Sequence, residues 1–232
     1  MNLSVQLLSL LALLFSSATQ DANPAVTPVP RSDTGIQERQ AEVLRRAKTS
    51  AASPVVFIGD SITQGWEGQK SWQDQFAALG ALNLGVSGDR TEHVLWRLQQ
   101  APITRLEPKV VVLLIGTNNL GHGSSTGEQT LAGVLEVIAL LHAQAPRAVL
   151  LVHEIFPRGE RINPMRGDIA QINQVLRGQA GPTTRVLGLG DRWVRADGTI
   201  GKEIMPDFLH LSPAGYEQWA AALAPEIRAA LK

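Results

Sequence analysis

The stretch VVFIGDSI, residues 55–62, decides the fold of this chain. Four apolar residues run directly into Gly59, Asp60 and Ser61. A continuous apolar run of this kind is typical of a strand buried on both faces of a parallel sheet. In an open α/β sheet, ligands bind just beyond the carboxyl ends of the strands, which is where Ser61 falls. Ser61 is therefore either a nucleophile on a strand-to-helix turn or the N-cap of the next helix, because serine caps helices routinely.

Strands and helices alternate along the rest of the chain. Apolar runs predict parallel strands at 55–58, 81–84, 110–115, 148–152 and 185–189. Apolar residues at helical spacing predict helices at 36–48, 71–79, 91–99, 131–143, 169–176 and 213–231. The expected fold class is α/β, with three α/β/α layers in which helices cover a five-stranded parallel sheet of flavodoxin-like order.

The composition is that of an ordinary globular chain. Hydrophobic residues make up 44% of the 232 residues, and 21 basic side chains balance 21 acidic ones. A balanced chain without a basic run gives no reason to expect nucleic acid or an anionic membrane as a partner. The absence of cysteine excludes disulfides, thiolate zinc sites and a cysteine nucleophile. No metal or other cofactor is expected, because the histidines lack ligand spacing at 93, 122, 142 and 153.

The N-terminal residues divide into two segments. An almost unbroken apolar core at Leu7–Phe15, followed by small residues, predicts a secretory signal peptide over residues 1–18. The core is too short for a comfortable membrane span, so a secreted or periplasmic protein without a span in its mature chain is expected. An uncleaved N-terminal helix is the alternative. Residues 19–34 are rich in proline and small residues, which predicts an exposed linker outside the core, ahead of one domain over 35–232.

Residues that can carry chemistry follow three strands and precede the last helix. Ser61, Gly88 and Asn118 each follow a predicted strand, whereas Asp207 and His210 lie in the loop before the closing helix. The first three can converge, because parallel strands bring their carboxyl ends to one edge. The last loop must return to that edge for His210 to join them. Each residue also has a structural interpretation: His210 as a buried histidine, Asp207 as a cap, Gly88 and Asn118 as turn residues.

Together these residues fit nucleophilic catalysis. A serine hydroxyl is a weak nucleophile until a base takes its proton, and His210 is the candidate base because imidazole titrates near neutral pH. Asp207, three residues earlier, can reach the other ring nitrogen and hold its tautomer. The backbone N–H groups of Ser61 and Gly88 and the side-chain amide of Asn118 can supply an oxyanion hole.

Four sequence blocks resemble those of the SGNH, or GDSL-type, hydrolases in order and approximate spacing. The blocks are GDSI at 59–62, Gly88, GTN at 116–118, and Asp207 with His210. Residues 88–98, 157–160 and 207–212 are also similar to the catalytic subunits of intracellular platelet-activating-factor acetylhydrolase. The resemblance implies the SGNH hydrolase fold, metal-free ester hydrolysis through an acyl-enzyme, and pairing as a homodimer. It also implies Ser61 as nucleophile, His210 as base, Asp207 as its partner, and an oxyanion hole completed by Gly88 and Asn118.

The expected substrate is a short acyl ester. We expect a serine esterase that removes an acetyl group from a small-molecule or glycan ester, with Leu209 contacting the substrate beside the base. One alternative is a lipid-directed acetylhydrolase or lysophospholipase-like enzyme. Another is a non-catalytic carbohydrate-binding module on the same scaffold. The complete set of Ser61, Asp207 and His210 argues against the module, because a binding protein does not need all three.

Three further groups have two interpretations each. Asp60 is a candidate for the triad carboxylate, but we prefer it as an acceptor that organises the turn, since Asp207 is nearer to His210 in sequence. Arg158, after the fourth strand, either meets an anionic substrate or forms an exposed ion pair. The five tryptophans either stack on sugar rings or, as is more usual, pack in the core.

Overall fold

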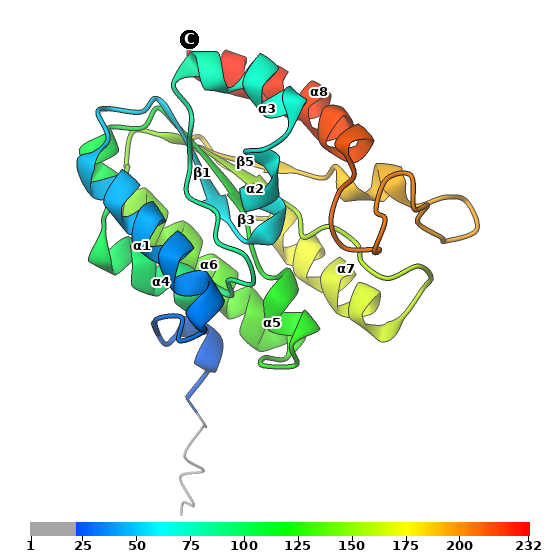
Figure 1. Ribbon diagram of the computed structural model, residues 1–232. Coiled ribbons are helices and arrows are strands. Elements are labelled where there is room, and N and C mark those ends of the chain that lie inside the picture. The colour runs from blue at the N-terminus through cyan, green and yellow to red at the C-terminus, as the bar shows by residue number, and fades with distance from the viewer. Residues whose placement is uncertain (1–21) are drawn as a thin grey trace, which may run out of the picture.

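The computed structural model describes residues 22–232, and within them five parallel strands form one central sheet (Figure 1). The predicted signal peptide, residues 1–18, lies outside the described residues. The strands follow the order β2-β1-β3-β4-β5, which confirms the predicted flavodoxin-like sheet. Their bounds are Val55–Gly59 for β1, Leu82–Asn83 for β2, Val110–Leu114 for β3, Val149–His153 for β4 and Thr184–Leu187 for β5.

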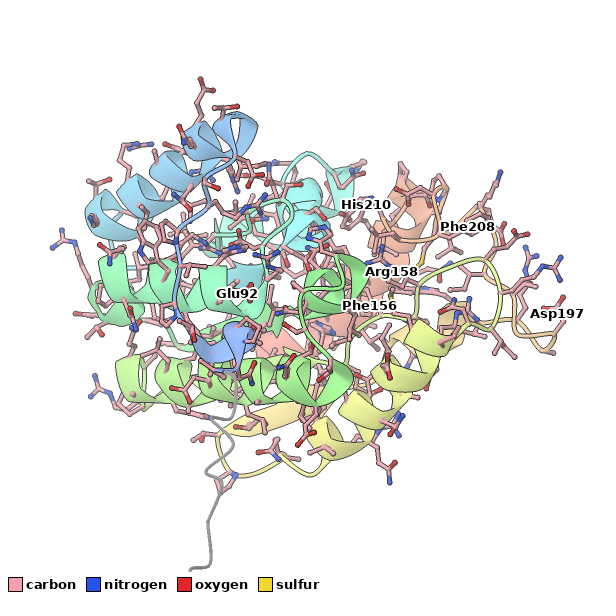
Figure 2. The ribbon with its side chains drawn as sticks, turned by 90° about the horizontal axis from the view of Figure 1, so that it is seen from below. Glu92, Phe156, Arg158, Asp197, Phe208 and His210 are labelled. Carbon is pink, nitrogen blue, oxygen red and sulfur yellow. The ribbon has the colours of Figure 1, made fainter. Side chains whose placement is uncertain are left out.

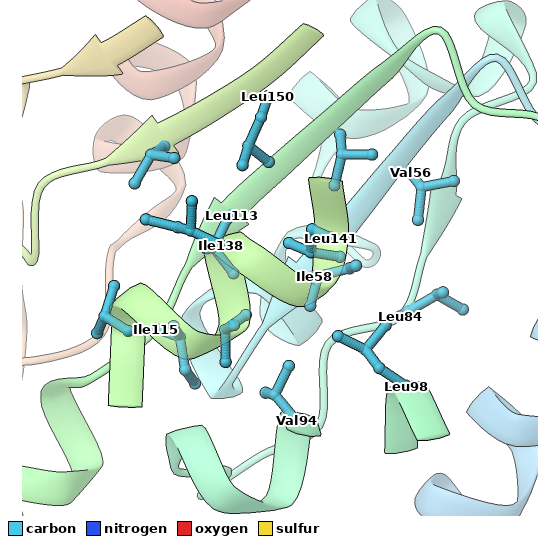
Figure 3. Packing of buried hydrophobic residues seen from close by; sticks show 14 of the residues in the cluster. Val56, Ile58, Leu84, Val94, Leu98, Leu113, Ile115, Ile138, Leu141 and Leu150 are labelled. Carbon is cyan, nitrogen blue, oxygen red and sulfur yellow. The ribbon is translucent and has the colours of Figure 1, made fainter. Parts of the chain in front are cut away.

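Helices cover both faces of the sheet, so the predicted three-layer α/β/α fold is confirmed. One face carries four helices: α1 (Thr34–Thr49), α4 (Thr91–Gln100), α6 (Gly127–Gln144) and α7 (Pro164–Arg177). The other carries α2, Ser61–Trp66, α3, Lys70–Gln75, and α8, Pro213–Ala230. Successive residues of β1 point to opposite layers: Val56 and Ile58 pack in the first cluster (Figure 3), and Val55 and Phe57 in the second. This two-sided burial explains the continuous apolar run.

Two short segments differ from the predicted boundaries. The helix expected over 71–79 ends as α3 at Gln75, because Phe76 departs from helical geometry at φ −123° and the chain continues in the 3-10 helix η2, Ala77–Leu79. Gly80, at φ 69°, ends this segment, since left-handed backbone suits glycine. The segment after β3, predicted as a loop, begins with the short helix α5, Thr117–Gly121.

Residues 22–33 are largely exposed, but the prediction that they form a linker outside the core is wrong. Pro24–Val26 form the 3-10 helix η1, and Ala25 is fully buried. The carbonyl oxygen of Ala25 accepts a hydrogen bond from Thr91 Oγ1 at 2.7 Å. It fits because α6 has no side chain at Gly133, where a Cβ would lie 2.7 Å from that oxygen. The segment therefore packs on α4 and α6 as part of the domain.

Most tryptophans belong to the core, as expected. Four of the five, Trp66, Trp72, Trp193 and Trp219, are buried. Trp66 and Trp219 stack with ring centroids 3.9 Å apart, which ties α2 to α8. Further 3-10 turns lie at Ile103–Leu106 and Gly190–Trp193. Within residues 22–232, no helix has the length and apolar character that crossing a membrane requires.

Candidate active site

The turn from β1 to α2 presents Ser61 at the carboxyl edge of the sheet. Asp60 is the N-cap of α2, because its Oδ1 accepts a hydrogen bond from the backbone N–H of Ile62 at 2.9 Å. Ser61 is the first residue of the helix, so the alternative in which Ser61 is the cap is wrong. Gly59 lets the turn close tightly, since a Cβ there would lie 2.4 Å from the carbonyl oxygen of Leu114. The serine hydroxyl is thus left free for another partner.

A continuous row of hydrogen bonds joins Ser61 to the loop before α8. Ser61 Oγ lies 2.9 Å from His210 Nε2, and His210 Nδ1 lies 2.7 Å from Asp207 Oδ2. An ionised carboxylate only accepts hydrogen bonds, so Nδ1 of a neutral ring must carry the proton and donate to Asp207. Nε2 then has a free electron pair and accepts from the serine hydroxyl. The predicted return of the last loop to the sheet edge is confirmed.

Asp207 is held as an anion by the loop around it. Its Oδ1 accepts hydrogen bonds from the backbone N–H groups of Leu209 at 3.1 Å and His210 at 2.7 Å, while Oδ2 faces the His210 ring. Burial by itself would raise the pKa of Asp207. The hydrogen bonds from the ring and the two N–H groups outweigh burial and hold the pKa below its usual range.

The candidate oxyanion donors come from three neighbouring turns. The N–H groups of Ser61 and Gly88 have no acceptor in the part of the chain that the structure describes. Gly88, at φ 72°, lies in the turn that follows β2. Asn118 Nδ2 donates one hydrogen to the carbonyl oxygen of Asp89 at 3.0 Å, which ties α5 to this turn and leaves the second hydrogen available. The backbone N–H of Val86 donates to the carbonyl oxygen of Gly59 at 3.1 Å and joins the same turn to β1.

Arg31 supports the Gly88 turn, a role that no sequence motif indicates. Its Nη1 donates to the carbonyl oxygen of Ser87 at 2.9 Å and lies 3.5 Å from Asp89 Oδ1. A Cβ at residue 88 would lie 2.9 Å from the same Nη1 atom. The left-handed backbone therefore favours glycine at position 88, and a larger residue would also displace the guanidinium of Arg31. Arg31 comes from the segment predicted as a linker, where no motif or spacing marks it.

Asp60 organises the turn that carries Ser61, the role preferred for it from the sequence. Its carboxyl group is completely buried, and Oδ2 has no hydrogen-bond partner in the described structure. Burial raises the pKa of Asp60 to about 7. Its observed acceptor role is toward Ile62, whereas the carboxylate that contacts His210 is Asp207.

The remaining candidate residues have defined surroundings. Leu209 is half-buried and packs against the cluster on the α8 side of the sheet. Arg158 is half-buried, and no carboxylate pairs with it in residues 22–232, so the exposed ion pair is wrong. His153 is buried and its Nε2 accepts from Trp219 Nε1 at 3.1 Å; burial lowers its pKa to about 3. No cluster of three or more His, Asp or Glu side chains suited to a metal occurs among the described residues.

A serine–histidine–aspartate row at the carboxyl edge of a flavodoxin-like sheet is the arrangement of a serine hydrolase. Residues 57–218 match the GDSL-like lipase/acylhydrolase family, and the chain belongs to this family. The chain is 38% identical over 208 residues to platelet-activating factor acetylhydrolase IB subunit alpha1 from Bos taurus, which covers 88% of each chain. These matches confirm the resemblance stated from the sequence motifs.

Solved structures share the fold at lower sequence identity. A GDSL-like lipase from Bacteroides thetaiotaomicron is 22% identical with a TM-score of 0.65, covering 82% of this chain and 99% of that one. A catalytic mutant of an acetylxylan esterase from Geobacillus stearothermophilus is 19% identical with a TM-score of 0.59, covering 78% and 96%. From its family and relatives, the chain is a carboxylic ester hydrolase, and the hypothesis of a non-catalytic binding module is set aside.

Proposed function

We propose that this chain is a serine esterase that removes an acetyl group from a carbohydrate ester through an acyl-enzyme on Ser61. The observation that carries the proposal is the row of hydrogen bonds from Ser61 Oγ through His210 to Asp207. The three side chains have the partners and tautomer that general-base activation of a serine needs.

The reaction follows from these contacts in two halves. Ser61 Oγ attacks the ester carbonyl carbon while its proton passes to His210 Nε2, and Asp207 stabilises the resulting imidazolium. The oxyanion of the tetrahedral intermediate accepts hydrogen bonds from the N–H groups of Ser61 and Gly88 and from Asn118 Nδ2. His210 then returns the proton to the leaving alcohol, and the acyl-enzyme remains. A water molecule, deprotonated by His210, releases the acid and restores the hydroxyl of Ser61.

The acyl part and the alcohol part of the proposed substrate have separate support. The Bos taurus relative is named as an acetylhydrolase, and one solved structure of the same fold is named as an acetylxylan esterase. The proposed catalytic residues also lie open to solvent, with the side chains of Asp207 and His210 56% and 43% exposed. An open, polar centre suits a bulky hydrophilic alcohol such as a sugar. The name of the relative supports the second candidate, an acetylated lipid.

An acyl series and two natural-type substrates test this proposal. We expect 4-nitrophenyl acetate to be hydrolysed with a higher kcat/KM than the butyrate and octanoate esters, and acetylated xylo-oligosaccharide faster than a 2-acetyl glycerophospholipid. Release of acetate can be measured for both the oligosaccharide and the phospholipid. A preference for octanoate would contradict the acetyl specificity, and a preference for the lipid would replace the carbohydrate by the second candidate.

Replacing Asn118 should impair chemistry more than binding. We expect Asn118→Ala to lower kcat by roughly 10²–10³, the effect typical of losing one oxyanion donor. KM should change little, because the charge that Asn118 stabilises exists only in the transition state. The measurement is kcat per folded molecule, beside a thermal melt.

Asn119→Ala is the matched control for this variant. Asn119 is also buried, but its amide donates to Thr91 Oγ1 at 3.1 Å and Glu92 Oε2 at 3.0 Å, within the packing of α4. The control should lower the melting temperature and leave kcat per folded molecule nearly unchanged. If Asn118→Ala behaves in the same way, Asn118 is not an oxyanion donor.

A further inference from the structure

Arg158, in the loop between β4 and α7, has an unused edge on its guanidinium group. Its Nη1 donates to the carbonyl oxygen of Thr117 at 3.1 Å and to Thr117 Oγ1 at 3.3 Å. The other edge, formed by Nε and Nη2, has neither a hydrogen-bond acceptor nor an ion-pair partner in residues 22–232. Because Arg158 is half-buried and these two atoms have no acceptor in the described chain, they are available to bind a group of a ligand.

The same edge is occupied in other arginines of this protein. Arg177 places Nε and Nη2 on the two carboxylate oxygens of Glu154, at 2.6 and 3.0 Å. Arg97 donates from Nε to Asp89 Oδ2 at 2.9 Å, and its Nη2 lies 2.8 Å from the same oxygen as an ion pair. The planar fork of arginine matches the two oxygens of a carboxylate in the geometry of Arg177. Arg158 therefore presents a carboxylate-binding edge on which the described protein places no carboxylate.

The position of Arg158 is built into the fold. Gly121 leaves room for the guanidinium, since a Cβ there would lie 2.2 Å from Nη1 and 2.9 Å from Cζ. The carbonyl oxygen of Arg158 accepts hydrogen bonds from Asn163 Nδ2 and Arg166 Nε, both at 3.1 Å. The backbone of Arg158 and the Nη1 atom of its guanidinium are thus both held by hydrogen bonds, which reduces the entropy cost of binding a ligand group.

The loop that carries Arg158 is joined to the loop that carries the proposed base. The backbone N–H of Gly159 donates to the carbonyl oxygen of Phe208 at 2.8 Å, so the Arg158 loop is bonded to the loop that carries His210. Figure 2 labels Arg158 near His210 and Phe208. Burial lowers the pKa of Arg158, against the opposing effect of the Asp60 and Asp207 carboxyl groups nearby. A partly desolvated cation attracts an anion more strongly than an open surface arginine does.

We propose that Arg158 binds a carboxylate carried by the substrate and makes this esterase selective for esters of acidic molecules. The inference rests on the proposed function, because it names the chemical class of the substrate at the same site. Within that function, the substrate is an acetylated sugar or other alcohol with a carboxylate a short distance from the ester. If Arg158 only positioned Thr117 and α5, its replacement would slow the hydrolysis of charged and neutral esters equally.

Paired esters that differ only in charge test the inference. The pairs are 3- and 4-acetoxybenzoate and the neutral 3- and 4-acetoxybenzamide, assayed per folded molecule with wild type and Arg158→Gln. For at least one pair, we expect the wild type to prefer the carboxylate by roughly 10–100-fold in kcat/KM, the usual effect of a charge-assisted pair. Arg158→Gln should abolish this preference and leave the amide rates within about twofold, because the amides never used the charge.

Two further variants make the outcome decisive. Arg158→Lys should keep only part of the preference, because an ammonium group lacks the planar fork, and it provides the test if the glutamine variant fails to fold. Arg161→Gln, an exposed arginine of the same loop, should change neither rate. Equal losses on carboxylate and amide, or no carboxylate preference in the wild type, would overturn the inference and leave the proposed function standing. Failure of the wild type to hydrolyse even 4-nitrophenyl acetate would overturn both.

Discussion

Ser61→Ala should lower kcat by roughly 10⁴-fold or more, because Ser61 Oγ is the atom that forms the acyl-enzyme in the proposed mechanism. In the described structure Ser61 Oγ has one hydrogen-bond partner, His210 Nε2, and the residue lies at a helix start outside both core clusters. We therefore expect an unchanged thermal melt. The measurement is the hydrolysis of 4-nitrophenyl acetate by purified, folded variant.

Ser71→Ala is the matched control for the loss of a hydroxyl group. Ser71 is buried, and its Oγ accepts a hydrogen bond from Trp66 Nε1 at 3.0 Å. Its replacement should cost about 1–2 kcal/mol of stability, because the indole N–H is left unpaired, while kcat per folded molecule is retained. A Ser61→Ala variant that keeps more than about a hundredth of the wild-type kcat would remove Ser61 as the nucleophile.

Asp207→Asn should lower kcat by roughly 10⁴-fold through the tautomer of His210. Asp207 Oδ1 accepts from two backbone N–H groups, so the oxygen of asparagine must stay there and its NH₂ group must take the place of Oδ2. That NH₂ group donates to His210 Nδ1 and forces the ring proton onto Nε2. The ring can then no longer accept the proton of Ser61. The measurement is kcat at neutral pH, with a thermal melt to show that the loop stays folded.

Asp197→Asn separates this effect from a general loss of charge. Asp197 forms a similar turn, with Oδ1 accepting from the backbone N–H and the hydroxyl of Thr199 at 2.9 and 2.7 Å, and Figure 2 shows it away from His210. We expect wild-type kcat from this control. If Asp207→Asn also keeps nearly full activity, another group must orient His210, and the buried Asp60 becomes the first to examine.

Most of the fold could be predicted because two-sided burial leaves a clear mark on the sequence. The apolar runs of β1 and β3 follow from helices on both faces of the sheet. The helix α5 was missed because threonine and asparagine favour turns in isolation. Here Gly116, at φ 120°, redirects the chain after β3, and Asn118 is held by the carbonyl oxygen of Asp89.

The residues of the site that lie in sequence motifs could be predicted, and the residues that support them through tertiary contacts could not. Ser61, Asp207 and His210 lie in short sequence blocks whose spacing reflects the turns that hold them. Their proximity in the fold could therefore be predicted from the sequence. Arg31 contacts residues more than fifty positions away, and its role depends on a segment that docks only because Gly133 leaves a gap on α6. The free edge of Arg158 is likewise visible only once Thr117 and Gly121 are in place. Such tertiary contacts produce no periodic pattern in the local sequence, so they cannot be predicted from it.

Covalent labelling by a fluorophosphonate can show whether Ser61 is the nucleophile. The reagent phosphonylates a serine that a neighbouring histidine activates, and peptide mapping by mass spectrometry locates the adduct. We expect a single adduct on Ser61, absent from Ser61→Ala and formed far more slowly in Asp207→Asn. An adduct on another residue, or hydrolysis of 4-nitrophenyl acetate by enzyme whose Ser61 is fully phosphonylated, would contradict this role of Ser61.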